Sequence, residues 1–175
     1  LVEAMDIVRC EHPNARLLFV GDGQTRPALE ALVRQRGLED AVSFVGRVEC
    51  HEVPWWISAS DLCVVLHRPV RFYPGDSMKL WEYLACARPV VATAGEGYGD
   101  LVETLGAGVS VKGDDVPALA EGLCRLIQNP ASANRMGQSG RAAVLAAHTW
   151  DARAVELERV LGVVSIEPQR ERVCA

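Results

Sequence analysis

Two charged residues, Lys79 and Glu82, lie three positions apart in a stretch that is otherwise apolar. Ser77 precedes them and favours the start of a helix, because its hydroxyl can accept a hydrogen bond from an unpaired backbone N–H group. The apolar residues that follow, from Met78 to Ala85, recur at helical spacing. We therefore predict a helix that Ser77 caps, with one apolar face and with Lys79 and Glu82 in its first turns.

This helix start has the features of an anion site. Unpaired N–H groups and the positive end of the helix dipole together attract a phosphate, and Lys79 adds a full positive charge. Glu82 lies further along, where a carboxylate can accept hydrogen bonds from sugar hydroxyls, as acidic residues do with ribose in dinucleotide-binding folds. The pattern suits a nucleoside diphosphate. An ordinary surface ion pair between Lys79 and Glu82 explains the same spacing.

The elements that position these residues alternate between strands and helices. We expect strands at residues 17–20, 42–45, 62–66, 90–92 and 106–111, and helices at 1–10, 25–36, 51–60, 78–85, 117–127, 131–147 and after 149. This order predicts an α/β fold with a Rossmann-like doubly wound parallel sheet of about five to six strands and helices on both faces. We assign residues 1–161 to one domain and residues 162–175 to a flexible tail.

Glycines follow the first two expected strands. Gly21 and Gly23 form a GxG sequence between a strand and a helix, which is the outline of a phosphate loop. The third glycine of the dinucleotide fingerprint is missing, so a tight turn explains the pair better than a phosphate loop does, and an NAD-dependent enzyme is disfavoured. Gly46 closes the next strand. His67 follows a third strand at its carboxyl end, where α/β sheets place ligands, although a lone histidine is more often structural.

The composition excludes several classes of function. The net charge of −5 argues against nucleic-acid binding by bulk electrostatics. The six cysteines are scattered, and no CxxC or Cys/His cluster suggests a metal or redox site. No apolar run reaches the roughly 18 residues that a membrane helix needs. We therefore expect a cytoplasmic protein with reduced thiols.

The run SMKLWEYLACARPVVAT, residues 77–93, resembles the signature of the family 4 retaining glycosyltransferases, which have the GT-B fold. The resemblance extends over residues 1–161 and matches the second, donor-binding domain of the two Rossmann-like domains in such enzymes. It implies transfer of a sugar from a UDP- or GDP-sugar to an acceptor, with retention, and without a metal or other cofactor.

The resemblance also implies roles for individual residues. Glu82 would bind the ribose of the donor. The residues implied at the donor diphosphate are Gly75, Ser77, Met78 and Lys79, those in the loop facing the donor cleft are Gly21 and Gly23, and those at the base are Gly46, Arg47 and Val48.

One position departs from the family pattern. Many members carry a glutamate eight residues before the ribose-binding glutamate, where it contacts the transferred sugar, and this chain has Pro74 there. Asp76 lies near that position, so Asp76 and Lys79 are our candidate catalytic residues. The departure leaves open a second hypothesis, a non-catalytic nucleotide-binding or interaction domain of the same fold. A nucleotide-sugar epimerase is a more remote alternative.

The resemblance covers one domain of a two-domain enzyme. It implies that the N-terminal acceptor domain, any contact with a membrane, and an Arg and a Lys that bind the diphosphate lie outside this chain. We therefore expect the chain alone to bind the donor weakly and to be inactive in transfer.

Overall fold

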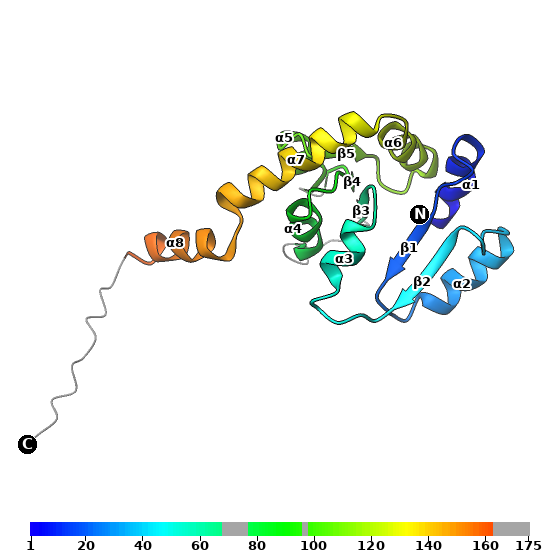
Figure 1. Cartoon of the computed structure of the whole chain (residues 1–175), viewed down its shortest axis with the longest axis horizontal. Helices are drawn as coiled ribbons and strands as arrows, with labels where there is room; N and C mark the ends of the chain where they lie inside the picture. The colour runs from blue at the N-terminus through cyan, green and yellow to red at the C-terminus, as the bar shows by residue number, and fades with distance from the viewer. Residues whose placement is uncertain (68–76, 96–97, 163–175) are drawn as a thin grey trace, which may run out of the picture.

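A computed structural model describes residues 1–67, 77–95 and 98–162 of the 175-residue chain. Its strands form two parallel sheets, β1–β2 and β3–β4–β5, with helices around them (Figure 1). The strands are β1 (Leu17–Val20), β2 (Val42–Gly46), β3 (Cys63–Val65), β4 (Val90–Thr93) and β5 (Gly108–Val111). The expected tail beyond Gly162 lies outside the described residues.

The helices follow the predicted alternation closely. They are α1 (Val2–Glu11), α2 (Arg26–Gln35), α3 (Val53–Ser58), α4 (Met78–Ala85), α5 (Tyr98–Thr104), α6 (Val116–Gln128), α7 (Pro130–Ala147) and α8 (Trp150–Val160). None of these helices has the length and apolar character that crossing a membrane requires. The α/β class with parallel strands is confirmed.

The sheet differs from the prediction in one respect. We expected a single sheet of about five to six strands, whereas the five strands of the described residues divide into a pair and a triplet. No ladder between described residues joins β1 to β3, because β1 pairs with β2 and β3 pairs with β4. The hydrophobic pattern of each strand identifies it as a strand but does not specify its neighbour.

Helix α1 packs against both halves of the fold. Val2 and Met5 belong to the apolar cluster of β1, β2 and α2. Ala4 and Val8, which point to a different side of the same helix, pack in the cluster that contains Val91 of β4 and residues of β5 and α6. The two sheets are therefore connected through the two apolar faces of one helix.

The three-stranded half has the most deeply buried core. Residues Val90–Ala92 of β4 are fully buried, as are Leu80 and Leu84 of α4. Helix α7 approaches this region closely at Gly137, where a Cβ atom would lie 2.0 Å from the carbonyl oxygen of Ala87. Only glycine fits at this contact, so the turn between α4 and β4 is held against α7.

Three helices begin with side-chain caps. Asp115, Asn129 and Thr149 accept hydrogen bonds from the backbone N–H groups three residues later, at 3.0, 3.0 and 3.2 Å. Each of these bonds satisfies one of the orphan donors at a helix start. These caps mark the starts of α6, α7 and α8.

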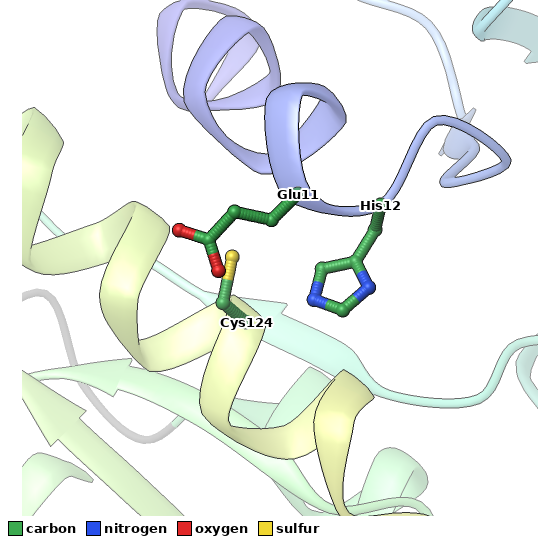
Figure 2. A group of neighbouring side chains, drawn as sticks. All are labelled: Glu11, His12 and Cys124. Atoms are coloured by element: carbon green, nitrogen blue, oxygen red, sulfur yellow. The ribbon is translucent and has the colours of Figure 1, made fainter.

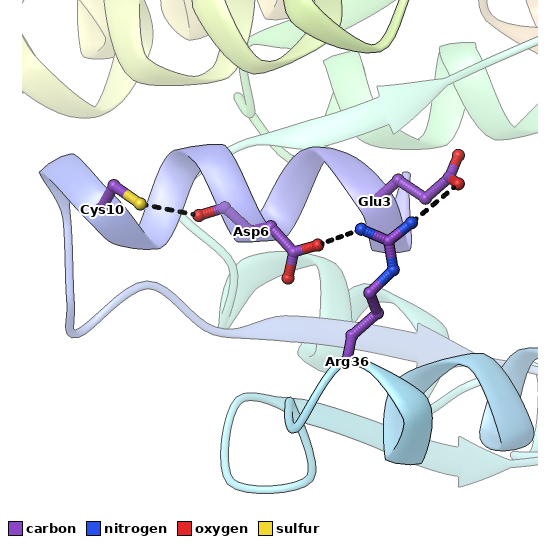
Figure 3. A network of polar contacts seen from close by, with 4 residues as sticks. All are labelled: Glu3, Asp6, Cys10 and Arg36. Atoms are coloured by element: carbon purple, nitrogen blue, oxygen red, sulfur yellow. Dashed lines mark hydrogen bonds and ion pairs between the residues drawn. The ribbon is translucent and has the colours of Figure 1, made fainter.

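Surface ion pairs connect α1 to the segment that follows α2. Arg36, which follows α2, contacts the carboxylates of Glu3 at 3.2 Å and Asp6 at 2.7 Å (Figure 3). Arg9 contacts Asp40 at 2.8 Å, and its hydrogen bond lowers the pKa of that carboxyl group. These contacts are exposed to solvent, so they contribute little to stability compared with the apolar core.

Candidate functional site

Helix α4 begins at the predicted place. Ser77 is its N-cap residue by position, with φ −85° and ψ 100°, but its side chain makes no capping hydrogen bond. The predicted bond to the Ser77 hydroxyl is therefore wrong. The backbone N–H of Leu80, one of the groups that such a hydroxyl would satisfy, donates instead to the backbone carbonyl of Ser77 at 3.0 Å. This i to i+3 bond tightens the first turn.

The predicted amphipathic character of α4 is confirmed except at Met78. Leu80 and Leu84 are fully buried, which fixes the orientation of the helix on its sheet. Lys79 and Glu82 are exposed. Met78, which the spacing placed on the apolar face, is 59% exposed, so its assignment to that face is wrong. The packing thus leaves the charged residues of α4 directed to solvent.

Lys79 and Glu82 do not form the surface ion pair that would have explained their spacing. No oxygen of Glu82 lies within 4.0 Å of the Lys79 ammonium, and neither side chain pairs with another charged residue in the described ranges. Both groups remain available to a ligand.

The loops after β1 and β2 lie together. The N–H of Gly21 donates to the carbonyl of Gly46 at 2.7 Å, and both residues have positive φ, +120° and +85°. Side chains rarely adopt these conformations, so the two glycines satisfy a backbone requirement. The N–H of Gly23 donates to the Oδ1 atom of Asp22 at 2.8 Å. A tight turn thus accounts for this GxG pair, and the loop is also open to solvent.

Arg26 lies beside these loops and was missed in the sequence. Its guanidinium contacts Glu30 at 2.8 Å and lies 5.7 Å from the centre of the Phe44 ring. A Cβ atom at Gly46 would lie 3.5 Å from its Nη1 atom. The hydrogen bond to Glu30 raises the pKa of Arg26. In the sequence, Arg26 stands at the first residue of the helix that follows the GxG pair, and this position could have indicated that its side chain lies beside the loop.

The remaining predicted site residues are in different settings. Arg47 is exposed and Val48 is half-buried, in the segment that follows β2. Gly75 and Asp76, with Pro74, lie outside the described residues.

The carboxyl ends of β3, β4 and β5 surround a pocket of about 390 Å³. His67 and Thr93 line it, and the backbone N–H of His67 donates to the Oγ1 atom of Thr93 at 3.1 Å. The Nδ1 atom of His67 is buried without a hydrogen-bond partner in the described part of the chain. Lys112, Asp114 and Asp115 add charged groups. Parallel sheets bind ligands at this edge, so the pocket is a candidate site that sequence analysis identified only through His67.

The predicted site residues fall into two groups, which lie in different parts of the fold. Ser77, Met78, Lys79 and Glu82 share α4, whereas Gly21, Gly23, Gly46, Arg47 and Val48 belong to the two-stranded half. No residue of either group lines the pocket at the ends of β3–β5.

Comparison with known proteins agrees with this architecture. The family model described as "Glycosyl transferases group 1" matches residues 1–129. A GDP-mannose-dependent monoacylated alpha-(1-6)-phosphatidylinositol monomannoside mannosyltransferase from Corynebacterium glutamicum is 31% identical, over 97% of this chain and 44% of that protein. The chain thus spans less than half the length of this relative.

Solved structures show the same fold. Sucrose-phosphate synthase from Thermosynechococcus elongatus is similar with a TM-score of 0.77 and 30% identity, over 91% of this chain and 41% of that one. The C-terminal domain of a group 1 glycosyl transferase from Francisella tularensis (LpcC) is similar with a TM-score of 0.70 and 22% identity. The match covers 85% of this chain and 77% of that one. Anabaena Alr3699/HepE in complex with UDP-glucose is similar with a TM-score of 0.70 and 22% identity. The match covers 91% of this chain and 43% of that one. These neighbours have the Rossmann-like architecture of GT-B enzymes, and the chain belongs to the group 1 family of glycosyl transferases.

Proposed function

We propose that this chain is the donor-binding part of a retaining glycosyltransferase that uses a UDP- or GDP-sugar. The observation that carries the proposal is the start of α4. Buried Leu80 and Leu84 hold this helix in place, while Lys79 and Glu82 face solvent without an ion pair between them. A cation and a carboxylate at a helix start match the diphosphate and the ribose of a nucleotide sugar.

In the proposed reaction, the helix start stabilises the leaving diphosphate. The backbone N–H groups of Ser77 and Met78 and the ammonium of Lys79 would neutralise the charge that develops on its oxygens. This is a role that a metal ion plays in other transferases, so we propose a metal-independent transfer. Gly75 and Asp76 complete the proposed site, and Asp76 is the candidate for a contact with the transferred sugar.

Glu82 of α4 and the loops of the two-stranded half provide the other proposed contacts. Glu82 would accept hydrogen bonds from the ribose hydroxyls. Gly46, Arg47 and Val48 would contact the base, and the loop with Gly21 and Gly23 would face the donor cleft. The short Gly21–Gly46 hydrogen bond supports this proposal, because it holds the two loops together.

The identity of the nucleotide is left as a choice between two. The Corynebacterium relative is named as GDP-mannose-dependent, whereas the Anabaena structure contains UDP-glucose. The acceptor site and any membrane contact would belong to a further domain, since this chain spans 44% of that relative. We propose that the reaction takes place in the cytoplasm and that the chain alone transfers little sugar.

A second candidate is a non-catalytic nucleotide-binding domain. Pro74 favours it, because it stands where the resemblance to the family implies a glutamate that contacts the transferred sugar. Both candidates predict nucleotide binding, and only the first predicts transfer when an acceptor domain is supplied.

Calorimetric titration with UDP, GDP and NAD tests the donor site. We expect UDP or GDP to bind and NAD not to bind. Glu82→Ala should weaken nucleotide binding about tenfold or more, because the loss of an ordered ribose contact costs about 1–3 kcal/mol. Glu158→Ala is the matched control, since Glu158 is an exposed helical glutamate on α8. Equal affinity of Glu82→Ala and the unmodified chain would refute the assigned role of Glu82.

A further inference from the structure

We propose that Glu11, His12 and Cys124 form a binding site for a divalent transition-metal ion, with Zn²⁺ as the best fit. The three side chains come from the end of α1 and from the middle of α6, and Figure 2 shows them facing one another. One ligand atom from each, a carboxylate oxygen, an imidazole nitrogen and the thiol sulfur, lie within 4.8 Å of one another. This proposal does not depend on the proposed function.

The spacing is close to that of a metal site. Zn²⁺ bonds to sulfur at about 2.3 Å and to nitrogen and oxygen at about 2.0–2.2 Å, so its tetrahedral ligands lie roughly 3.3–3.7 Å apart. The ligand atoms, which lie within 4.8 Å of one another, must therefore approach by at most about 1 Å. Cys124 is buried on a helix and supplies the fixed point.

His12 provides an independent indication of a ligand. Its Nε2 atom is buried and has no hydrogen-bond partner among the described residues. Its backbone is fixed, because its N–H donates to Val8 at 2.8 Å and its carbonyl accepts from Ala15 at 2.9 Å. A buried polar atom without a partner is costly, and a metal ion would satisfy its lone pair.

A neighbouring side chain orients the Glu11 carboxylate. The Nε2 group of Gln128 donates to Glu11 at 3.0 Å and orients the carboxylate. Such outer contacts support metal ligands in known sites.

The ligand types select the metal. A set of one sulfur, one nitrogen and one oxygen favours Zn²⁺ and similar ions over Mg²⁺ or Ca²⁺, which prefer oxygen ligands. Three protein ligands leave a fourth position for water. Glu11, Cys124 and Gln128 line a pocket of about 690 Å³, which gives water and ions access to the site.

The position of the site suggests what the ion does. Leu1 and Glu3, at the start of α1, line the pocket at the carboxyl ends of β3–β5, as do Asp115 and Val116 at the start of α6. Glu11 and Cys124 lie further along the same two helices, which pack against each other (Figure 1). A metal ion would therefore clamp the far parts of two helices that frame a candidate ligand pocket. Its role is structural, so it is compatible with a metal-independent transfer.

Titration of the chain with Zn²⁺, and with Co²⁺ as a spectroscopic probe, tests the site. We expect one ion per chain, release of protons on binding, and a thiolate-to-Co²⁺ absorption band. Cys124→Ser should abolish that band, and both Cys124→Ser and His12→Gln should weaken Zn²⁺ binding about 100-fold or more. The control is Cys10→Ser, because Cys10 is an exposed thiol on α1 outside the cluster.

The His12→Gln variant distinguishes loss of a metal ligand from loss of folding. His12 lies in a turn at the end of α1 and is only half-buried, so this variant should keep the circular dichroism spectrum of the unmodified chain. The proposal is overturned if no stoichiometric Zn²⁺ binding occurs. It is also overturned if folded His12→Gln and Cys124→Ser bind Zn²⁺ as tightly as Cys10→Ser.

Discussion

The two sheets of this fold differ in how completely they are covered. Strand β4 is buried at every residue, because it has a strand on each side and helices on both faces. In β1, half-buried and exposed residues alternate, and Leu18 and Val20 are exposed. The covered half holds α4 rigidly, whereas the open half supplies glycine loops whose positions depend on backbone hydrogen bonds. The proposed donor contacts thus come from two regions of unequal stability.

The largest expected effect is in the covered half. Leu84→Ala should lower the free energy of unfolding by about 3 kcal/mol, because it leaves a cavity among fully buried residues. Leu18→Ala is the matched change in the open half and should cost less than about 1 kcal/mol, since this side chain is already 36% exposed. Urea denaturation measures both values. Similar losses would contradict the difference between the sheets.

A smaller effect is expected from Cys63 on β3. Burial raises the pKa of its thiol to about 12, from an ordinary value of 9.0. Above pH 9 the unfolded chain loses this proton while the folded chain keeps it, so stability is full below pH 9 and falls as the pH rises toward 12. The slope should approach about 1.4 kcal/mol per pH unit once the pH is well above 9.

Burial also raises the pKa values of Cys124 and Tyr83, so the contribution of Cys63 is the difference between the unmodified chain and a Cys63 variant, measured between pH 9 and 10. Unfolding followed in Cys63→Ala should show a correspondingly smaller slope over that interval. Cys10→Ala, which alters an exposed thiol, should keep the slope of the unmodified chain. Identical slopes in all three proteins would show that Cys63 is not protected.

The smallest effect is expected at the surface of the two-stranded half. Arg36→Gln removes the contacts to Glu3 and Asp6 and should cost no more than about 1 kcal/mol, because exposed ion pairs contribute little. The loss should diminish in high salt, which screens such pairs. Arg34→Gln alters an exposed arginine on α2 and serves as the control. A larger loss that persists in salt would show that the open half depends on this contact.

Local patterns predicted the elements well. The bounds of β1 and α4 agree with the ranges predicted from the sequence. These features depend on hydrophobic spacing and on side chains a few positions away, which a sequence displays directly.

Features that depend on competition or on distant contacts were not predicted. The cap at Ser77 failed because a backbone carbonyl already satisfies the N–H of Leu80. The pocket at the ends of β3–β5 and the cluster of Glu11, His12 and Cys124 combine residues that lie far apart in the chain. No spacing in the sequence indicates such neighbours. The roles of the predicted donor-binding residues stay predictions.

The two-sided packing of α1 has a consequence for the order of folding. During synthesis, β1, β2 and α2 emerge soon after α1, so Val2 and Met5 can be buried early. Ala4 and Val8 must wait until α6 has left the ribosome, since their partners include residues of that helix. Until then this side of α1 presents apolar surface, and a folding intermediate with that surface is the species on which a chaperone would act.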